Sequence, residues 1–510
     1  MPMAHVLSAG LHGIEAVPVH VEVDVHHGLL PKWSTVGLAE SAVREAKDRV
    51  LSAILNCGYE FPYRRITLNL APAHFKKSGT AYDLPIAIGL LSAAELFPKG
   101  ALDPCLFVGE LSLSGTLRPV RGILSIALLA RKLRIPTLIV PQDNVWETRA
   151  LNDLEVLGAP DLPAVVAFLA GRQKLPRAQD LPPISAPTPA EAPDFAEVIG
   201  QHQAKRALEI AASGFHHVLL VGPPGTGKSM LASRLPSILP PMEFEESLTT
   251  TQVYSMMGQL RPGECLVEER PYRAPHHTIS NAGLIGGGTQ PRPGEVTLAH
   301  NGVLFLDELP EFQRPVLESL RQPLETHRVT ISRAQESLTF PSRFLLTAAM
   351  NPCPCGHRGN PDRVCTCHEL EVRKYQAKIS GPLRDRMDMH IAVPSFDFFK
   401  PSPKPSEGSQ EIRKRVLRAR EIQRQRFQQT ALLFNSQMGP KEIEKFCEME
   451  DRGRGILQGA IKKWGFSLRA GHRILKVART IADLEASPCL AAHHLAEAIG
   501  YRQVSALAFP

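Results

Sequence analysis

Two kinds of hydrophobic spacing alternate along the first third of the chain. Alternate apolar positions over 17–25 and 65–71 predict half-buried strands, because successive strand side chains point to opposite faces. A continuous apolar run over 135–141 predicts a buried strand closed by proline. Helical spacing over 41–58 predicts an amphipathic helix, and the apolar segment 84–97 predicts a buried one. We therefore expect a mixed α/β domain here.

Later in the chain the pattern changes to short, continuous apolar runs. These runs predict three buried strands, within 215–239, 302–312 and 343–353, the first followed by a glycine-rich turn and a helix. Buried strands joined by helical crossovers predict a doubly wound parallel sheet. Beyond residue 400 the spacing is helical, with a basic helix over 411–427 and further helices over 441–508.

A proline-rich segment separates the two regions. Residues 173–194 carry six prolines and almost no large apolar side chains, which predicts a semi-rigid, partly extended linker. We expect an N-terminal domain over 1–172, an α/β core over 195–400 and a helical domain over 401–510.

Composition then narrows the class of protein. Of the 510 residues, 43% are hydrophobic and 21% charged, which is typical of a chain with a buried core. The net charge of +7 permits a polyanionic partner without requiring one. No signal-like segment and no membrane-length apolar run are seen. Without such a run we expect no membrane association, and nine cysteines, an odd number in a chain without a signal, predict a reducing, cytoplasmic location.

The glycine-rich turn carries the first recognisable chemistry. It reads G-x-x-x-x-G-K-S, in which backbone N–H groups wrap phosphate oxygens at the start of a helix. Lys228 would reach the β- and γ-phosphates of ATP, and Ser229 would hold Mg²⁺. A chance glycine turn is the alternative, against which the flanking strand and helix argue. The residues expected to contact the nucleotide are Gly222, Pro223, Pro224, Gly225, Thr226, Gly227, Lys228, Ser229 and Met230.

The next buried strand ends in two acids. Asp307 would hold Mg²⁺ directly or through water, and Glu308 would orient and polarise the attacking water. Acids in this place can also simply cap a turn, but beside a phosphate loop the catalytic role is favoured. Asn351 ends the third strand and could position the same water, although a strand-end Asn is also a common turn former.

Five segments in order, VIGQHQAKRALEIAASG, GPPGTGKS, LFLDELPEF, TAAMN and ISGPLRDRMD, resemble an AAA+ ATPase. The stretch RPYRAPHHTISNAGLIGGGTQPRPGEVTLAHNG before LFLDELPEF is similar to the magnesium-chelatase-like subfamily, the ComM/YifB family. The resemblance covers essentially the whole chain, including the N-terminal domain and a C-terminal helical lid. It implies an ATP-driven DNA helicase that promotes branch migration during natural transformation.

The resemblance also implies roles for other residues. Arg386 would be the arginine finger that reaches a neighbouring subunit's γ-phosphate, preferred over Arg384 because it keeps the Asp-Arg pairing. Arg469 would be the sensor arginine of the lid; the usual alternative for such arginines is a surface ion pair. A finger acting on a neighbour requires an oligomer, which for this fold would be a homohexamer. The residues expected near the adenine are Ile199, Gly200 and Gln201.

The N-terminal domain resembles the Lon protease fold. KKSGTAYDLPIAIG looks like the turn that carries the Lon nucleophile, and GELSLSGTLRPVRGIL like the stretch that ends in its catalytic lysine. Ala81 and Leu124 stand at those positions here, whereas a nucleophile needs a reactive group and an adjacent base. We expect an inactive domain with a structural or DNA-guiding role.

DNA contacts are expected on a hairpin and, less specifically, on a helix. Alternating runs within 323–344 predict a β-hairpin, which in related helicases projects into the central pore. Arg333 near its tip could contact DNA phosphates, and a solvated edge hairpin is an equal alternative. The basic helix over 411–427 could bind phosphate, but such runs are usually solvated faces. DNA binding would be sequence-tolerant.

Four cysteines in the loop 353–367 form two C-x-C pairs. Cys353, Cys355, Cys365 and Cys367 match the ligand count of a structural tetrahedral zinc site. The spacing within each pair is tighter than the usual two-residue gap, but the nine residues between the pairs can fold back. Reduced cysteines without a metal are the alternative.

The leading hypothesis is therefore a ring-shaped ATP hydrolase acting on DNA, with ATP, Mg²⁺ and a structural Zn²⁺. A magnesium-chelatase-like or protein-remodelling ATPase, acting on a protein partner, is the main alternative. An ATP-dependent protease is a third possibility, against which Ala81 and Leu124 argue. The sequence cannot separate these motors by itself, because an ATPase core specifies how energy is supplied and not what is moved.

Overall fold

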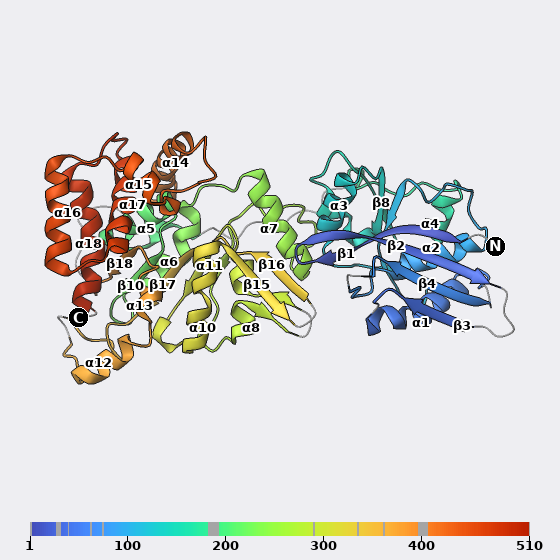
Figure 1. Cartoon of the computed structure of the whole chain (residues 1–510), viewed down its shortest axis with the longest axis horizontal. Helices are drawn as coiled ribbons and strands as arrows, with labels where there is room; N and C mark the ends of the chain where they lie inside the picture. The colour runs from blue at the N-terminus through green and yellow to red at the C-terminus, as the bar shows by residue number, and fades with distance from the viewer. Residues whose placement is uncertain are drawn as a thin grey trace. The chain divides into compact units, whose positions relative to one another are not determined.

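The computed structural model describes residues 3–26, 32–38, 40–61, 64–73, 76–181, 193–288, 291–333, 336–360, 363–395 and 406–508. The chain divides into two compact units (Figure 1). The first contains Met1–Thr188 and Phe244–Val267, and the second contains Pro189–Glu243 and Glu268–Pro510. Half of the predicted linker over 173–194, residues 182–192, lies outside the described residues.

A mixed seven-stranded sheet, in the order β3-β4-β2-β1-β5-β8-β9, forms the centre of the first unit. The pairs β1–β2 and β2–β4 are antiparallel, and the other neighbours are parallel. The strands predicted over 17–25, 65–71 and 135–141 are confirmed as β2, β4 and β8. The strands are β1 (Ala4–His12), β2 (Glu15–His26), β3 (Lys32–Val36), β4 (Arg65–Ala71), β5 (Cys105–Phe107), β8 (Thr137–Pro141) and β9 (Glu155–Ala159).

Helices and a small ribbon complete this unit. The amphipathic and the buried helix predicted from the pattern are α1 and α2, and α2 ends at Ala93, four residues earlier than predicted. The elements are α1 (Ser41–Asn56), α2 (Asp83–Ala93), the strand pair β6 (Glu110–Leu111) and β7 (Leu117–Arg118), α3 (Ile123–Lys132), the 3-10 helix η1 (Gln142–Thr148), α4 (Leu162–Leu169) and α7 (Phe244–Met257).

Helix α7 reaches this unit from a later part of the chain, within a segment that the sequence pattern does not separate from the ATPase core. Leu248 packs in the apolar cluster that contains Ile123 and Leu124 of α3. The carbonyl of Ser255 accepts a hydrogen bond from the backbone N–H of Gly122 at 3.2 Å. The first unit is thus built from two separate stretches of sequence.

The second unit contains the predicted parallel sheet. Five strands lie in the order β11-β14-β17-β10-β18, and every neighbouring pair is parallel. The three predicted buried strands are β10, β14 and β17, so the doubly wound AAA-type core is confirmed. The strands are β10 (Val218–Val221), β11 (Tyr272–Arg273), β14 (Val303–Leu306), β17 (Leu345–Met350) and β18 (Met389–Ala392).

Short helices and two hairpins connect these strands. The hairpin predicted within 323–344 is formed by β15 and β16, and a smaller one by β12 and β13. The connecting elements are the 3-10 helix η2 (Phe195–Glu197), α5 (His202–Gly214), α6 (Lys228–Ile238), α8 (Asn281–Leu284), β12 (Gly286–Gly287), β13 (Arg292–Pro293), α9 (Glu295–Leu298), the 3-10 helix η3 (Leu309–Glu311), α10 (Arg314–Ser319), α11 (Arg321–Thr326), β15 (Arg328–Arg333), β16 (Glu336–Pro341), α12 (Glu369–Gln376) and α13 (Gly381–Arg384).

The C-terminal part is helical, as predicted, and its helices gather at the red end of the chain (Figure 1). One apolar cluster contains residues of α5, of the parallel sheet and of these helices, so sheet and helices share a core. None of the helices in the described part of the chain combines the length and apolar character needed to cross a membrane. The helices are α14 (Ser409–Arg426), the 3-10 helix η4 (Asn435–Gln437), α15 (Pro440–Phe446), α16 (Asp451–Trp464), α17 (Leu468–Leu484) and α18 (Ala492–Ala508).

Candidate ATP site and arginine pocket

The predicted phosphate loop connects the carboxyl end of β10 to the first turn of α6. Gly225 and Gly227 have φ angles of 77° and 86°, a left-handed conformation that side chains rarely adopt. A Cβ on Gly222 would lie 2.1 Å from the carbonyl oxygen of Val393, so only glycine fits beside β18. The sequence thus shapes a tight turn whose N–H groups lead into a helix N-terminus, the arrangement that binds phosphate.

Lys228 joins the phosphate loop to the end of β17. Its Nζ donates to the carbonyl oxygens of Gly222 and Pro223 at 2.8 and 2.7 Å, and to Asn351 Oδ1 at 3.2 Å. Burial lowers the pKa of the Lys228 ammonium group. The structure therefore brings together the predicted phosphate-binding lysine and the predicted water-positioning asparagine, although they are far apart in sequence.

The two predicted magnesium ligands also meet. The hydroxyl of Ser229 donates to Asp307 Oδ2 at 2.5 Å. The other oxygen of Asp307 accepts from the backbone N–H of Glu308 at 2.9 Å. Glu308 itself has a left-handed backbone, with φ 50°, and its side chain is exposed. An acid that faces solvent next to a half-buried one fits the expected division into a water-activating and a metal-binding carboxylate.

His277 is a functional candidate that the sequence analysis missed. Its Nδ1 lies 3.2 Å from Glu308 Oε2, and its ring packs edge-on against Phe312. The residue follows β11, the strand that pairs with β14 and so lies beside the two acids. The available signal was the His-His pair directly after a strand, in RAPHHT, but its contact with Glu308 depends on strand order.

The residues expected near the adenine lie beside the loop. Gln201 directly precedes α5, and its Nε2 donates to the carbonyl oxygens of Thr226 and Pro394 at 3.3 and 2.8 Å. Ile199 is 48% exposed, and Gly200 has a positive φ of 67°. An exposed apolar side chain on a turn tied to the phosphate loop suits contact with a flat base. Met230, on α6, is also exposed.

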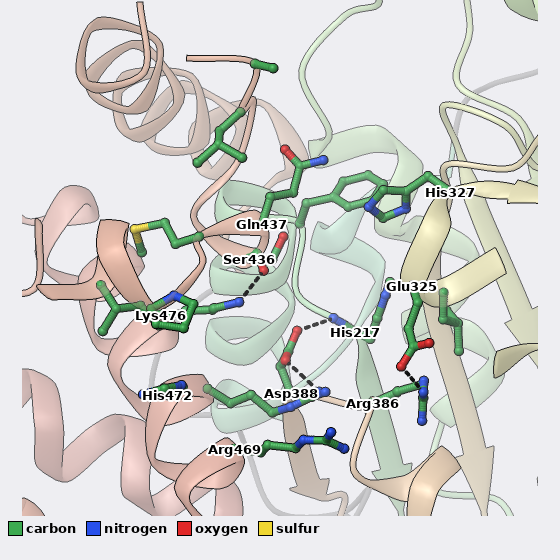
Figure 2. A pocket seen from close by; sticks show the side chains of 18 residues that line it. His217, Glu325, His327, Arg386, Asp388, Ser436, Gln437, Arg469, His472 and Lys476 are labelled. Carbon is green, nitrogen blue, oxygen red and sulfur yellow. Dashed lines mark hydrogen bonds and ion pairs between the residues drawn. The ribbon is translucent and has the colours of Figure 1, made fainter. Parts of the chain in front are cut away.

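Arg386 and Arg469 line a cavity at the amino ends of the parallel strands, whereas the phosphate loop lies at their carboxyl ends. The phosphate loop follows β10, whereas His217 and Asp388 directly precede β10 and β18, which run parallel. The phosphate loop and the cavity are therefore separated by the length of β10, which is about 13 Å for a four-residue strand. His217, Asp388 and both arginines line the cavity, which has a volume of about 520 Å³ (Figure 2). Neither arginine is thus beside the phosphate loop of its own chain.

The predicted zinc ligands converge in the structure. One ligand atom from each of Cys353, Cys355, Cys365 and Cys367 lies within 4.8 Å of all the others. Three of the sulfur–sulfur distances are 3.4, 3.7 and 3.6 Å. Zinc–sulfur bonds of about 2.3 Å in a tetrahedron require sulfur–sulfur distances of about 3.8 Å. The four thiols therefore fit a tetrahedral zinc ion, and the tight C-x-C spacing does not prevent convergence.

The cysteine loop packs against the phosphate loop. A Cβ on Gly356 would lie 2.6 Å from Cδ of Pro224, so the two loops approach to within contact distance. The side chain of Gln376 in α12 donates to the carbonyl of Pro352 at 3.1 Å. The cysteine loop thus lies against one side of the candidate nucleotide site.

The positions of the Lon nucleophile and lysine are apolar here. Leu124 is fully buried in an apolar cluster, and Ala81 packs against that same cluster. The hydroxyl of Thr80, the nearest alternative nucleophile, donates to the carboxylate of Glu110. Lys77 is directed to the carbonyl of Pro72. This surrounding supplies no general base paired with a nucleophile at those two positions.

The hairpins differ from the basic helix as possible DNA contacts. A Cβ on Gly286 would lie 2.7 Å from Ile331 Cδ1, so the hairpin β12–β13 packs against β15. The side chain of Arg333 lies outside the described residues, and its contact with DNA stays a prediction. On α14, Lys414 and Arg424 pair with Glu411 and Glu421 at 2.7 and 2.8 Å. These ion pairs favour the solvated-face interpretation of the basic helix.

Comparison with protein-family models yields three matches that together span most of the chain. Residues 194–400 match the model described as magnesium chelatase, subunit ChlI. Residues 21–144 match subunit ChlI of Mg-chelatase, and residues 406–502 match the C-terminal part of that subunit.

Comparison with curated proteins gives full-length relatives. The chain is 45% identical to the competence protein ComM of Haemophilus influenzae, over 98% of both chains. It is also 45% identical to the uncharacterized protein YifB of Escherichia coli, over 97% of this chain and 96% of YifB. Lon protease 2 of Bacillus subtilis is 31% identical over 28% of this chain and 27% of its own length.

Proposed function

Because this chain belongs to the ComM/YifB family of magnesium-chelatase-like AAA+ ATPases, we propose that it is a hexameric DNA motor. It would use ATP hydrolysis to promote branch migration during homologous recombination and natural transformation. The observation that carries the proposal is the full-length similarity to a protein named for competence. ATP hydrolysis itself follows from the family's ATPase domain.

In the proposed hydrolysis step, each of the residues at the carboxyl ends of the parallel strands has one role. Lys228 contacts the β- and γ-phosphates, and its contact with Asn351 keeps it at the end of β17. Ser229 and Asp307 are the residues that would hold Mg²⁺, which neutralises phosphate charge when bound. Glu308 accepts a hydrogen bond from the attacking water and orients it, and Asn351 positions the same water.

The placement of the arginines supports action between subunits. Arg386 and Arg469 line one cavity at the sheet edge opposite the phosphate loop. In a ring, one edge of each subunit faces the next subunit's nucleotide, so both arginines would serve the neighbour's ATP. This extends the role of Arg469, for which the resemblance implied a sensor function without specifying which nucleotide it contacts.

The two hairpins are the proposed DNA contact. On the hairpin β15–β16, the buried side chains Val329 and Phe340 alternate with the exposed hydroxyls of Thr330 and Thr339, which lie 3.1 Å apart. Arg333 is at the tip. Hydroxyls and an arginine can bind phosphates without reading bases, so DNA binding would be sequence-tolerant and weakened by salt.

The cysteine cluster is proposed to hold one structural zinc ion. The convergence of four thiols at near-tetrahedral distances supports it. Four protein ligands leave no open position for water, so zinc would brace the loop beside Pro224 and take no part in hydrolysis.

A protein-remodelling or chelatase-like ATPase is the second candidate. The match of three segments to the ChlI subunit of magnesium chelatase favours it. Such an ATPase would act on a protein partner, and DNA would leave its hydrolysis rate unchanged.

The test is the steady-state ATPase rate with and without single-stranded DNA, duplex DNA and a four-way junction. We expect stimulation by DNA that decreases as salt rises. A rate that no DNA form changes, with no DNA binding at low salt, would favour the protein-remodelling alternative.

A further inference from the structure

The proposed arginine finger is already bound to an acid of its own chain. Arg386 Nη2 donates to Glu325 Oε1, and the two side chains point toward each other at the rim of the cavity (Figure 2). Nη1 donates to the carbonyl of Pro382 at 2.8 Å. The Nε atom is buried and has no hydrogen-bond partner in the described part of the chain. Glu325 therefore contacts only one nitrogen of the Arg386 guanidinium, Nη2.

This contact competes with the proposed task of Arg386. A carboxylate and a phosphate both have negatively charged oxygens that accept hydrogen bonds from the guanidinium N–H groups, so they compete for the same donors. The Arg386 side chain is only 11% exposed, whereas that of Glu325 is 60% exposed. Arg386 must therefore leave Glu325, and turn outward, to reach a nucleotide on another subunit.

Glu325 is also next to the proposed DNA contact. It lies in the last turn of α11, three residues before β15 begins at Arg328. Thr326 ties the helix to the strand, because its hydroxyl is 3.0 Å from the carbonyl oxygens of both Gln322 and Arg328. A displacement of the hairpin β15–β16 would consequently shift the carboxylate of Glu325 relative to Arg386.

We propose that Glu325 is a positioning residue that retains Arg386 until DNA displaces the hairpin β15–β16. Two states alternate: Arg386 on Glu325, or Arg386 on the neighbour's γ-phosphate. DNA that favours the second state raises hydrolysis in the adjacent site, since a ligand shifts an equilibrium through its different affinity for the two states. This proposal rests on the proposed function, because it requires Arg386 to act as a finger and the hairpin to contact DNA.

The test compares ATPase rates of full-length rings with and without single-stranded oligothymidylate. Four variants are needed: Glu325→Gln, Glu325→Asp, Arg386→Ala and the double variant Glu325→Gln/Arg386→Ala. Glu421→Gln is the matched control, because Glu421 forms an exposed ion pair with Arg424 at 2.8 Å on α14, outside the cavity. Ring formation is checked for each variant by sedimentation.

We expect Glu325→Gln to raise the DNA-free rate and to lower the stimulation by DNA. An exposed ion pair typically shifts an equilibrium by up to about fivefold, which sets the expected rise. Glu325→Asp keeps the charge and should stay near the wild-type rate, as should Glu421→Gln. In the Arg386→Ala background Glu325→Gln should change nothing, because the proposed effect passes through Arg386.

Three results would overturn the proposal, and each identifies what failed. If Glu325→Gln leaves the DNA-free rate unchanged or lowers it, while Arg386→Ala abolishes hydrolysis, Arg386 is an arginine finger that Glu325 does not retain. If Arg386→Ala rings hydrolyse ATP like the wild type, Arg386 is not an arginine finger, and its retention by Glu325 has no effect on hydrolysis. If Glu325→Gln raises the rate but oligothymidylate does not stimulate the wild type, the link to DNA is wrong.

Discussion

Single side chains decide where the carboxylate of Glu308 points. The Glu308 side chain is 57% exposed, so packing restrains it little. The contact of its Oε2 with His277 Nδ1 holds the carboxylate in place. His277 is held in turn by Phe312 on one side and by the ring of His276, whose centroid is 4.0 Å away, on another. The geometry of the attacking water would therefore depend on an imidazole that is absent from both sequence motifs.

We predict that His277→Ala lowers kcat for ATP about three- to tenfold, which corresponds to the loss of one ordinary hydrogen bond of about 1 kcal/mol. KM should change little, because Lys228 and Ser229 still bind the phosphates. His493→Ala is the control, since His493 lies on α18, is 65% exposed and pairs with Glu485 instead, at 2.9 Å. An unchanged kcat in His277→Ala, measured at saturating ATP, would show that the contact with Glu308 is not used in hydrolysis.

The residues of the phosphate loop were predictable because their chemistry is local. Glycine spacing, Lys228 and Ser229 occupy one short segment, and strand-end acids are visible in a hydrophobic pattern. His277 and Glu325 were not predictable in the same way. Their partners, Glu308 and Arg386, are brought to them only by strand order and by the fold of the α11–β15 corner.

At the scale of elements, the cysteine loop is the one most open to a chemical test. Protein purified without chelators should contain about one zinc ion per chain by elemental analysis. The double variant Cys353→Ser/Cys355→Ser should lose it, together with part of the ATPase activity, because the loop contacts Pro224 of the phosphate loop. Cys489→Ser, at an exposed cysteine outside the cluster, is the control. Wild-type protein that is free of zinc and fully active would contradict the site.

Two buried histidines anchor the amino end of β17. His217 Nδ1 accepts from the backbone N–H of Leu346 at 3.1 Å, and His300 Nδ1 accepts from that of Arg343 at 2.9 Å. An accepting nitrogen cannot carry a proton, so both rings are neutral when these bonds form. Burial lowers the pKa of His217 to about 4 and that of His300 to about 3.

These shifts predict a loss of stability in acid. Between the usual histidine pKa of about 6.5 and the lowered values, the unfolded chain binds more protons than the native one. The free energy of unfolding should thus be unaffected by these groups above about pH 6.5 and should decrease below it, by up to about 1.4 kcal/mol per pH unit and histidine.

The variant His300→Asn separates this effect from general acid lability, because an amide oxygen can accept from Arg343 but does not titrate. Thermal unfolding followed from about pH 7 to about pH 5 should shift less in His300→Asn than in the wild type. His493→Asn, at a histidine whose side chain is 65% exposed, should behave like the wild type. An equal shift in all three proteins would mean that His300 is not responsible.

Elements with one apolar face were predictable, and α7 shows where that rule ends. Its buried positions include Ser247, Thr250, Thr251 and Ser255, which read as polar in the sequence. Within the helix, the hydroxyl of Thr251 donates to the carbonyl of Ser247 at 2.6 Å, so the polar group is satisfied and can be buried. No hydrophobic pattern therefore indicated that α7 packs in the first unit.

At the scale of the whole molecule, the separation of Lys228 from Arg386 predicts sites shared between subunits. Alone, Arg386→Ala should lose about 10³- to 10⁵-fold in hydrolysis rate, the usual effect of removing an arginine finger. Mixing Arg386→Ala with Lys228→Ala subunits should restore part of the activity, because some interfaces then combine an intact loop with an intact finger. Mixed rings that assemble and stay inactive at every ratio would argue against action in trans.

Movement of a DNA junction at the expense of ATP is the property on which the proposed function depends. The decisive measurement is the conversion of a labelled, homologous four-way junction to its migrated products, followed over time with ATP. We predict ATP-dependent conversion by the wild-type chain and none by Glu308→Gln, which should still bind ATP because Lys228 and Ser229 are intact. A junction that stays unconverted while the wild-type chain binds it and hydrolyses ATP would contradict the proposed branch migration.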